Sequence, residues 1–504
     1  MRSALHAWLL RRAEPPLGLG VLALGALMTL GYAPFGLWPL ALLSLAGLWW
    51  LTRHAAHTRQ AAGAALVWGL GHHITALYWL PWAFFKDSGG SWLAAIGGGV
   101  PAVLGLAVFG SLTYILAGVL AYKIGQRGHW IVARVVWVLA ILGIEFVKGL
   151  HPMGFPWLPV GAIFADSLTM MQTAALGGVW LLSGLGLTVA VMLANVQRRC
   201  LSAAFVLLAL MAAYGTWRLQ SAPTQPSDTW VRVVQPNIQS AHKWDAQARW
   251  MFLQDTLRTA LDGEAGVAEA VPETVIMPET AVAFYLDEED DVRLAIASRL
   301  AATLPPEGGL ITGSVRRAAN PGQPLPKFYN SFVAMDTRGV LRGVYDKQLL
   351  VPFGEYIPLR GWLEALPLPL TLRTFSQSRI DFTHGERSPL LPTPAGMALG
   401  LICYEGIFPY HVLRHAEGAR YLANITNDGW FTGTIALYQH AALARLRAVE
   451  TGLPLVRVAN TGLTLVYDGM GREVLRLPIN TAMHADVNLP AVTAAPLVRR
   501  WLTR

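Results

Sequence analysis

The chain has 504 residues, of which 54% are hydrophobic and only 14% are charged, and its formal net charge at pH 7 is +8. This length exceeds one ordinary domain, and the composition excludes a purely soluble globular protein, so membrane-spanning segments are expected. The positive charge gathers at the ends of apolar runs, which is typical of membrane topology signals, and no nucleic-acid partner is expected.

Four runs in the first half contain no Asp, Glu, Lys or Arg, and each is long enough to cross a bilayer, which needs about 20 residues. These runs are residues 15–52, 60–85, 88–122 and 167–197. The first run has room for two spans, because GYAPFGLWP interrupts it with Pro34 and Gly36, which favour a turn. The pattern predicts seven helices, at about 16–31, 37–52, 61–81, 97–120, 130–150, 172–195 and 201–218.

Lysine and arginine mark alternate ends of the predicted helices. These residues are Arg2, Arg11, Arg12, Arg53, Arg59, Lys123, Arg127, Arg134, Arg198 and Arg199. By the positive-inside rule the marked ends lie in the cytoplasm, and seven spans then place everything after Trp217 on the opposite side. We therefore expect residues 1–220 to form a multi-pass transmembrane domain in a bacterial inner (cytoplasmic) membrane, with the second half of the chain in the periplasm.

A stretch rich in Pro, Ser and Thr, residues 221–229, is expected to be a linker. Beyond it, short β-rich runs alternate with helical stretches, which predicts an α/β soluble domain over residues 230–489 and a C-terminal tail over 490–504. Strands are expected at 230–235, 274–278, 309–315, 329–335, 397–404, 421–427 and 454–460, and helices near 246–262, 290–304 and 436–452.

Three polar residues stand where predicted strands end: Glu279 after TVIMP, Lys347 in YDKQLL, and Cys403 in MALGLICY. Open α/β sheets place their ligand crevice at the carboxyl ends of strands. A thiol attacks a carbonyl only as a thiolate, so it needs a nearby base and a nearby cation, roles that Glu279 and Lys347 can fill. Taken singly, the Glu and Lys also fit solvated loop positions, and the Cys fits a packed core position.

The chain has only two cysteines, and Cys200 is expected at a cytoplasmic helix end, so a disulfide to the exported Cys403 is not expected. The sequence contains no Cys/His cluster with zinc spacing and no glycine-rich phosphate loop. Neither a metal nor a cofactor is therefore expected.

The order Glu, Lys, Cys, in the contexts PET, DK and CYE, resembles the nitrilase superfamily, also called the carbon-nitrogen hydrolases, whose members are αββα sandwiches. Joined to a helical first half, the chain is similar over nearly its full length to the apolipoprotein N-acyltransferase family. Members of that family usually close with one more membrane helix, whereas residues 487–504 are too short and too charged to span. The sequence segments that carry the resemblance are YAPFGLWP (32–39), GFPWLPVG (154–161), VQPNIQSAHKWD (234–245), LVPFGEYIP (350–358), TNDGWF (426–431) and RLRAVETGLPLVRVANTG (445–462).

The resemblance implies a two-step, ping-pong acyl transfer. Cys403 corresponds to the nucleophile that takes a fatty acyl chain from a membrane phospholipid as a thioester, Glu279 to the general base and acid, and Lys347 to the charge-stabilising residue. The acyl chain then passes to the α-amino group of the N-terminal diacylglyceryl-cysteine of an apolipoprotein. The resemblance implies no cofactor, and we expect a monomer.

Four further positions match the family. Glu355 resembles a further essential carboxylate, and Trp244, Tyr404 and Glu405 match positions that handle substrate. Without the resemblance, Trp244 would be interpreted as a packing residue, and Tyr404 with Glu405 as a hydrogen-bonding pair at a strand end.

Two rival interpretations stay open at this point. The first is a membrane-anchored nitrilase-type amidase or hydrolase, which uses the same trio with water as the acceptor, and the second is a catalytically silent scaffold that binds lipoproteins. The segment YIPLRGWLEALPLPLTLRTF (356–375) is rich in Leu, Pro and aromatic residues. It is equally compatible with a lid that dips into the membrane interface and with an irregular loop that packs on its own domain.

Overall fold

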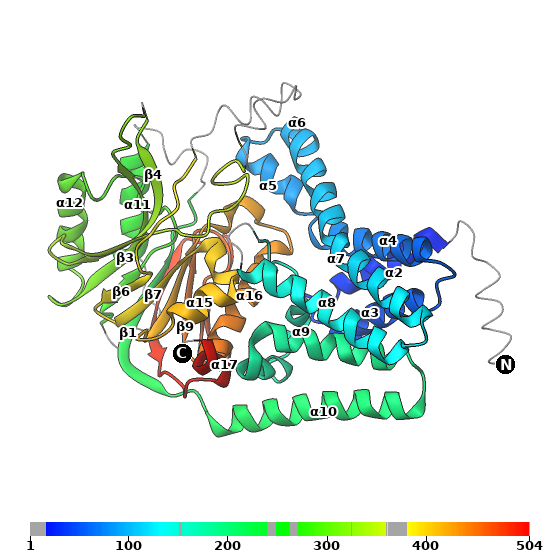
Figure 1. Cartoon of the computed structure of the whole chain (residues 1–504). Coiled ribbons are helices and arrows are strands. Elements are labelled where there is room, and N and C mark those ends of the chain that lie inside the picture. The colour runs from blue at the N-terminus through cyan, green and yellow to red at the C-terminus, as the bar shows by residue number, and fades with distance from the viewer. Residues whose placement is uncertain are drawn as a thin grey trace.

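A computed structural model of the chain describes residues 17–150, 154–238, 248–262, 271–323, 325–358, 360 and 381–502. A bundle of helices from the first half lies beside a β-sandwich from the second half, and the long helix α10 (Arg198–Ser221) leads from one to the other (Figure 1). The fold class predicted from the sequence, an apolar helical domain joined to an α/β domain, is confirmed.

Seven helices of the first half lie at the predicted places. They are α2 (Leu17–Thr29), α3 (Trp38–Arg53), α4 (Thr58–Ala76), α7 (Val100–Gln126), α8 (Trp130–Leu150), α9 (Ala174–Leu193) and α10. The third of these helices, α4, ends earlier than predicted, because a separate short helix with Pro81 in its first turn follows it, α5 (Leu80–Asp87). The short helix α6 (Trp92–Ala94) comes next.

Four stretches of the described chain are long and apolar enough to cross a membrane. They are Trp92–Gln126, Trp130–Leu150, Met170–Leu193 and Arg198–Ser221. The helices α2, α3 and α4 do not meet the same criteria of length and composition, so for them a full span stays a prediction. The chain is therefore a membrane protein with at least half of its predicted spans supported by the helices themselves.

Glycines bring the first helices into close contact. A Cβ atom at Gly71 of α4 would lie 2.1 Å from the carbonyl oxygen of Leu22 in α2, and one at Gly25 of α2 would lie 1.9 Å from that of Trp68 in α4. Backbones at this distance leave no room for a side chain, so glycine is required at both crossings, as is common between membrane helices.

Two six-stranded sheets form the sandwich. The first has the order β12-β1-β2-β3-β4-β5 and the second β11-β10-β9-β8-β7-β6. The strands of the first sheet are β1 (Pro226–Gln235), β2 (Thr274–Ile276), β3 (Gly309–Ala318), β4 (Lys327–Asp336), β5 (Leu341–Asp346) and β12 (Met483–Pro490). Those of the second are β6 (Leu390–Thr393), β7 (Gly396–Ile402), β8 (Tyr421–Thr426), β9 (Leu455–Ala459), β10 (Leu465–Tyr467) and β11 (Glu473–Arg476).

The directions of the strands decide at which edge of its sheet each strand ends. β2 is parallel to β3, and β4 is antiparallel to both β3 and β5, so β2 and β5 run in the same direction and end at the same edge of the first sheet. In the second sheet the central strands β7, β8 and β9 are parallel. Buried side chains such as Ile276, Phe332, Ile402 and Val458 form one apolar core between the sheets.

Helices cover both faces of the sandwich, which gives the predicted αββα layers. The first sheet is covered by α11 (Arg249–Leu261) and α12 (Asp290–Ala301), whose apolar residues share a core with β1–β4. The second sheet is covered by α15 (Pro409–His415) and α16 (Ala436–Thr451). Nearly every residue of α16 is buried, because its far side packs on the helical bundle and belongs to the same apolar core.

The chain between the two halves is shorter than the predicted linker. β1 begins at Pro226, which pairs with Pro490 of β12, so residues 226–229 belong to the first strand, with an irregularity before Trp230, instead of forming a connection. After β12 a short helix, α17 (Leu497–Leu502), packs beside α9 and α15, and Arg499 donates to the backbone carbonyls of Thr451 and Ala416.

Candidate active site

Glu279 and Lys347 lie together inside the sandwich. Glu279 follows β2 and Lys347 follows β5, and Lys347 Nζ lies 3.7 Å from Glu279 Oε1. Both side chains are almost completely buried, at 8% and 1% exposed. Glu355 completes the cluster, because its carboxylate oxygens accept from Lys347 Nζ at 2.9 Å.

These carboxylates decide the charge state of the lysine. Burial alone lowers the pKa of Lys347, but the charges of Glu355 and then Glu279 outweigh burial and raise the pKa above its ordinary value. Lys347 is therefore an ammonium ion at any physiological pH.

Asn330 of β4 joins the two carboxylates and was missed by the sequence analysis. Its Nδ2 donates to Glu279 Oε1 at 2.7 Å and to Glu355 Oε1 at 2.9 Å. The second oxygen of Glu279 accepts from the backbone N–H of Asn427 at 2.8 Å. The available signal was a buried polar residue inside the apolar strand YNSFVAM, a position that normally requires hydrogen-bond partners.

Cys403 follows β7 directly and begins a 3₁₀ turn, Cys403–Ile407. Its φ angle is +50°, in the left-handed region that non-glycine residues seldom adopt. Burial raises the pKa of its thiol, and the charge of Glu279 raises it further, whereas Lys347 lowers it. The net shift is upward, so the resting group is a thiol that needs a base before it can attack.

Glu405 connects the Cys403 turn to the Lys347 segment. Its Oε1 accepts from the Tyr345 hydroxyl at 2.6 Å and from the backbone N–H groups of Gln348 and Leu349 at 2.8 and 3.1 Å. Burial raises the pKa of Glu405, although hydrogen bonds oppose that shift. This carboxyl group therefore connects the end of β7 in the second sheet to the end of β5 in the first sheet.

Tyr404 points toward the helical half. Its hydroxyl donates to the carbonyl of Gly154 at 2.9 Å, and its ring lies 6.3 Å from that of Phe155. The next predicted site residue, Trp244, and residues 361–375 of the predicted lid lie outside the described residues.

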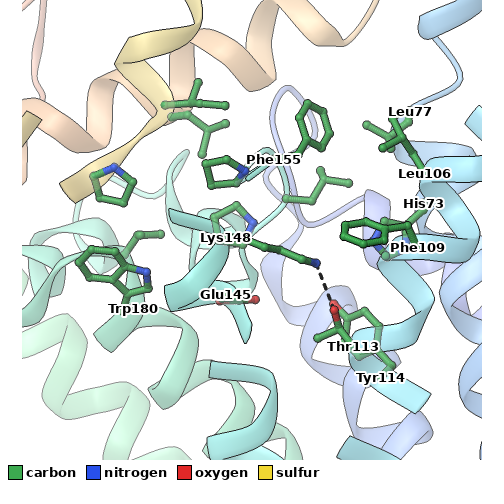
Figure 2. A pocket seen from close by; sticks show the side chains of 18 of the residues that line it. His73, Leu77, Leu106, Phe109, Thr113, Tyr114, Glu145, Lys148, Phe155 and Trp180 are labelled. Atoms are coloured by element: carbon green, nitrogen blue, oxygen red, sulfur yellow. Dashed lines mark hydrogen bonds between the residues drawn. The ribbon is translucent and has the colours of Figure 1, made fainter. Parts of the chain in front are cut away.

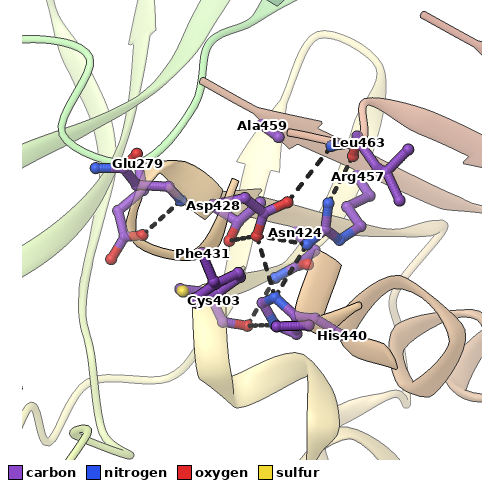
Figure 3. A network of polar contacts seen from close by, with 12 residues as sticks. Glu279, Cys403, Asn424, Asp428, Phe431, His440, Arg457, Ala459 and Leu463 are labelled. Carbon is purple, nitrogen blue, oxygen red and sulfur yellow. Dashed lines mark hydrogen bonds and ion pairs between the residues drawn. The ribbon is translucent and has the colours of Figure 1, made fainter. Parts of the chain in front are cut away.

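A second polar network holds the backbone of Cys403 (Figure 3). The Cys403 carbonyl accepts from Asn424 Nδ2 at 3.3 Å and from His440 Nε2 at 3.2 Å. His440 belongs to α16, and its Nδ1 faces Asp428 Oδ1 at 3.2 Å. Arg457 of β9 donates to the same Asp428 oxygen at 2.9 Å. None of these side chains was predicted from the sequence.

A pocket of about 50 Å³ lies where the helical half meets the sandwich (Figure 2). Its apolar walls include Phe109 of α7 and Trp180 of α9, and Ile407 of the Cys403 turn also lines it. Lys148 of α8 points into it and donates to Thr113 Oγ1 at 3.1 Å. The pocket thus joins the apolar helices to the turn that carries the thiol.

The described residues contain no group of three or more His, Cys, Asp or Glu side chains arranged to hold a metal ion. The buried polar cluster consists of the Glu279 and Glu355 carboxylates, the Lys347 ammonium and the Asn330 amide, with the Cys403 thiol beside it.

Comparison with known proteins identifies both halves. A family model for the apolipoprotein N-acyltransferase N-terminal domain matches residues 24–192, and the carbon-nitrogen hydrolase model matches residues 230–496. An apolipoprotein N-acyltransferase of Bradyrhizobium diazoefficiens is 36% identical over 94% of this chain and 90% of its own length. The chain belongs to the apolipoprotein N-acyltransferase family. A second member, from Rhodopseudomonas palustris, is 34% identical over the same shares of the two chains.

Two solved structures are similar to about half of this apolipoprotein N-acyltransferase family member. A mutant of a Nesterenkonia amidase from the nitrilase superfamily matches 55% of this chain and 94% of its own, with 17% identity and a TM-score of 0.38. A carbon-nitrogen hydrolase from Helicobacter pylori matches 51% and 88%, with 16% identity and a TM-score of 0.35.

Proposed function

We propose that this acyltransferase moves a fatty acyl chain from a membrane phospholipid, through a thioester on Cys403, to the α-amino group of the N-terminal diacylglyceryl-cysteine of apolipoproteins. The observation that carries the proposal is the buried Glu279–Lys347 pair at the strand edge that faces the Cys403 turn, in a sandwich packed on apolar helices. The names of the relatives support the acceptor, and the membrane helices support a lipid donor.

In the first half-reaction Glu279 accepts the thiol proton, and the Cys403 sulfur attacks the ester carbonyl of the phospholipid. Lys347 stabilises the negative charge that develops on the carbonyl oxygen. The C–O bond then breaks, and Glu279 returns the proton to the leaving alcohol of the lysophospholipid. The products are a thioester and a lysophospholipid.

In the second half-reaction the α-amino group of the apolipoprotein attacks the thioester. Glu279 accepts a proton from the amine as the N–C bond forms, and the C–S bond breaks. The proton returns to the Cys403 sulfur, which restores the resting thiol. The net result is an amide on the lipoprotein and an unchanged enzyme.

The remaining predicted site residues take supporting roles in this proposal. Glu355 holds the Lys347 ammonium in place, and Glu405 fixes the distance between the Lys347 segment and the Cys403 turn. Tyr404 fixes the same turn to the helical half. Trp244 remains a proposed substrate-binding residue.

We also propose a location and an assembly state. Residues 1–220 form the transmembrane domain of an inner-membrane protein, and residues 230–489 form the catalytic domain on the periplasmic side. The arrangement of basic residues supports this orientation. The protein acts as a monomer and uses no cofactor and no nucleic acid.

The proposal is tested by incubating the purified protein in detergent with phospholipid carrying a labelled acyl chain, with and without a diacylated lipopeptide. We expect a labelled adduct on Cys403 by mass spectrometry without the peptide, and a labelled N-acyl peptide when it is added. Cys403→Ala should abolish both products. Labelled free fatty acid with no N-acyl peptide would instead assign a hydrolase, and no turnover of any kind would assign a scaffold.

A further inference from the structure

Cys403 has a backbone conformation that its surroundings must hold in place. Its φ of +50° is unfavourable for a residue with a Cβ atom, and such residues persist only where neighbouring groups fix them. Two side chains do so, because Asn424 and His440 both donate to the Cys403 carbonyl. This carbonyl is the backbone group next to the thiol-bearing Cα, so its position sets the direction of the side chain.

The hydrogen bond to the carbonyl fixes the tautomer of His440. A carbonyl oxygen only accepts, so His440 Nε2 must carry the proton. Nδ1 is then an acceptor, and Arg457 Nη2 lies 3.0 Å from it as the matching donor. The same Arg457 nitrogen donates its other hydrogen to Asp428. Burial lowers the pKa of His440, in agreement with a neutral ring.

The pair behind His440 is fully buried and oriented by several bonds. The side chains of Asp428 and Arg457 are both 0% exposed. Arg457 Nη1 donates to the Leu463 carbonyl at 2.5 Å, which leaves the guanidinium little freedom to turn. Burial raises the pKa of Asp428, but the adjacent Arg457 guanidinium outweighs burial and lowers it, so the carboxylate is ionised.

The helical half supports the outer face of the imidazole. Trp157, in the segment between α8 and α9, stacks on His440 with ring centres 5.5 Å apart and planes 29° apart. Trp157 Nε1 donates to Gln439, the neighbour of His440 on α16, at 2.8 Å. The ring is therefore held on one edge by the sandwich and on one face by the membrane half.

We propose that His440 is a positioning residue for acyl transfer: its Nε2–H holds the Cys403 carbonyl and so keeps the nucleophile in the left-handed turn, while Arg457, itself held by Asp428, fixes the imidazole. The inference rests on the proposed role of Cys403. It also gives a function to the TNDGWF segment and to the helix and strand around RLRAVETGLPLVRVANTG, which the reaction steps leave unassigned.

Two substitutions of similar polarity test the proposal. In His440→Gln the amide nitrogen can occupy the place of Nε2 and reach the Cys403 carbonyl, whereas in His440→Asn the shorter amide occupies the place of Nδ1 and cannot. The measured quantity is the rate of the labelled acyl adduct on Cys403 in a single turnover. We expect His440→Asn to slow this step by about 100-fold, since small misplacements of a reacting group have effects of that size, and His440→Gln to stay within about tenfold of the unmodified protein.

His411→Asn is the matched control. His411 is also a buried histidine of the helical layer on the second sheet, but its Nε2 has no hydrogen-bond partner within the described chain. We expect the control to lower thermal stability as much as His440→Asn does while leaving adduct formation unchanged. KM for the phospholipid should stay constant in all three variants, because His440 is not proposed to touch the lipid.

The outcomes separate this inference from the proposed function. Equal rates for His440→Asn and His440→Gln, or a loss that follows thermal stability in all variants, would overturn the positioning role. If the unmodified protein forms no acyl adduct, the proposed function fails, and the positioning role is then judged from the alkylation rate of Cys403 by iodoacetamide in a Cys200→Ser background. An unchanged alkylation rate in His440→Asn would overturn it there as well.

Discussion

Cys403 combines a raised thiol pKa with a carboxylate and an ammonium nearby, and this combination decides how it reacts. Burial and Glu279 favour the protonated thiol, so a small alkylating reagent meets few thiolate ions at neutral pH. In the proposed reaction, acyl transfer avoids this limit because Glu279 removes the proton as the sulfur attacks. The cysteine is therefore expected to be slow toward simple electrophiles and fast toward its own substrate.

The pH dependence of alkylation follows from that state. In a Cys200→Ser background, the rate of Cys403 alkylation by iodoacetamide should rise continuously between about pH 6 and 9, because the thiolate fraction increases with pH until the raised pKa is passed. Mass spectrometry of the modified peptide measures this rate. A plateau below about pH 8 would contradict the raised pKa.

Asn330 supports both carboxylates with one amide nitrogen. Hydrogen bonds to charged groups contribute roughly 1.5 to 3 kcal/mol, so Asn330→Ala should slow adduct formation by at least tenfold. Asn320→Ala is the control, since Asn320 is a partly exposed loop residue whose side chain donates only to the Leu325 carbonyl among the contacts described here. Equal rates for the two variants would remove Asn330 from the site.

The sequence placed Glu279, Lys347 and Cys403 at strand ends, and the structure brings the first two into contact at one sheet edge. Asn330 offered only a weak signal, a polar residue inside an apolar strand, and the sequence did not indicate Asp428 in its turn or His440 in its helix. Their partners come from segments far away in the chain. Patterns along the chain predict where a polar residue meets a crevice, but they do not predict which buried polar residues meet each other.

Helix α9 contains a break, although the sequence predicted one continuous helix over residues 172–195. Gly177 and Gly178 have non-helical backbone angles, and Gly178 has φ of +69° and ψ of −172°. Beyond the break, the backbone N–H of Val179 donates to Glu450 of α16 at 2.8 Å. A carboxylate at the start of the resumed helix is favourable because of the exposed N–H groups there. The break thus connects a membrane helix to the helical layer of the sandwich.

Gly178→Ala should therefore destabilise the protein. Its backbone angles are almost exclusive to glycine and cost about 1 to 3 kcal/mol for other residues. Gly184→Ala on the same helix is the control, since a Cβ there meets only Leu142 at an ordinary 3.6 Å. Thermal unfolding in detergent should show a lower midpoint for Gly178→Ala and no loss for Gly184→Ala. A similar midpoint for both would mean that the break relaxes without cost.

The helices of the first half and the central strands of both sheets were predicted from hydrophobic patterns, whereas the strands at or near the sheet edges were not. Long apolar runs, most of them free of charged residues, predicted the seven helices, and compact β-branched runs predicted β1–β4 and β7–β9. The strands β5, β6 and β10–β12 were missed. LRGVYD of β5 and EVLR of β11 carry charges and are partly exposed, since they lie at sheet edges where the apolar pattern weakens. Pro226–Thr229 was predicted as part of a linker because it is polar, and only the pairing of Pro226 with Pro490 of β12 marks it as the start of a strand.

At the scale of the whole molecule, the two halves are joined by many specific contacts. Trp82 of α5 donates to the Thr432 carbonyl at 3.0 Å, Tyr404 donates to the Gly154 carbonyl, and Gln439 donates to the Ala76 carbonyl at 3.3 Å. These contacts lie on the side of the second sheet, near the Cys403 turn. The helical half therefore fixes the position of the Cys403 turn relative to the apolar helices.

The proposed topology gives a direct prediction. α10 has 24 residues, a length of about 36 Å at 1.5 Å per residue, so Cys200 at its start and the sandwich beyond its end should lie on opposite sides of the membrane. In intact spheroplasts a membrane-impermeant maleimide should label Leu325→Cys, which replaces an exposed loop residue of the sandwich. Cys200 should be labelled only after permeabilisation. Labelling of Cys200 in intact spheroplasts would reverse the orientation.

The buried position of α16 limits how this enzyme can exist. One side of that helix covers the second sheet, and the other is covered by the membrane helices. A version of the sandwich that begins at residue 222 would expose the apolar outer side of α16 to water. We therefore expect that the second half is not stable as a separate soluble enzyme. The helices of the first half anchor the domain and also form the outer layer that covers α16.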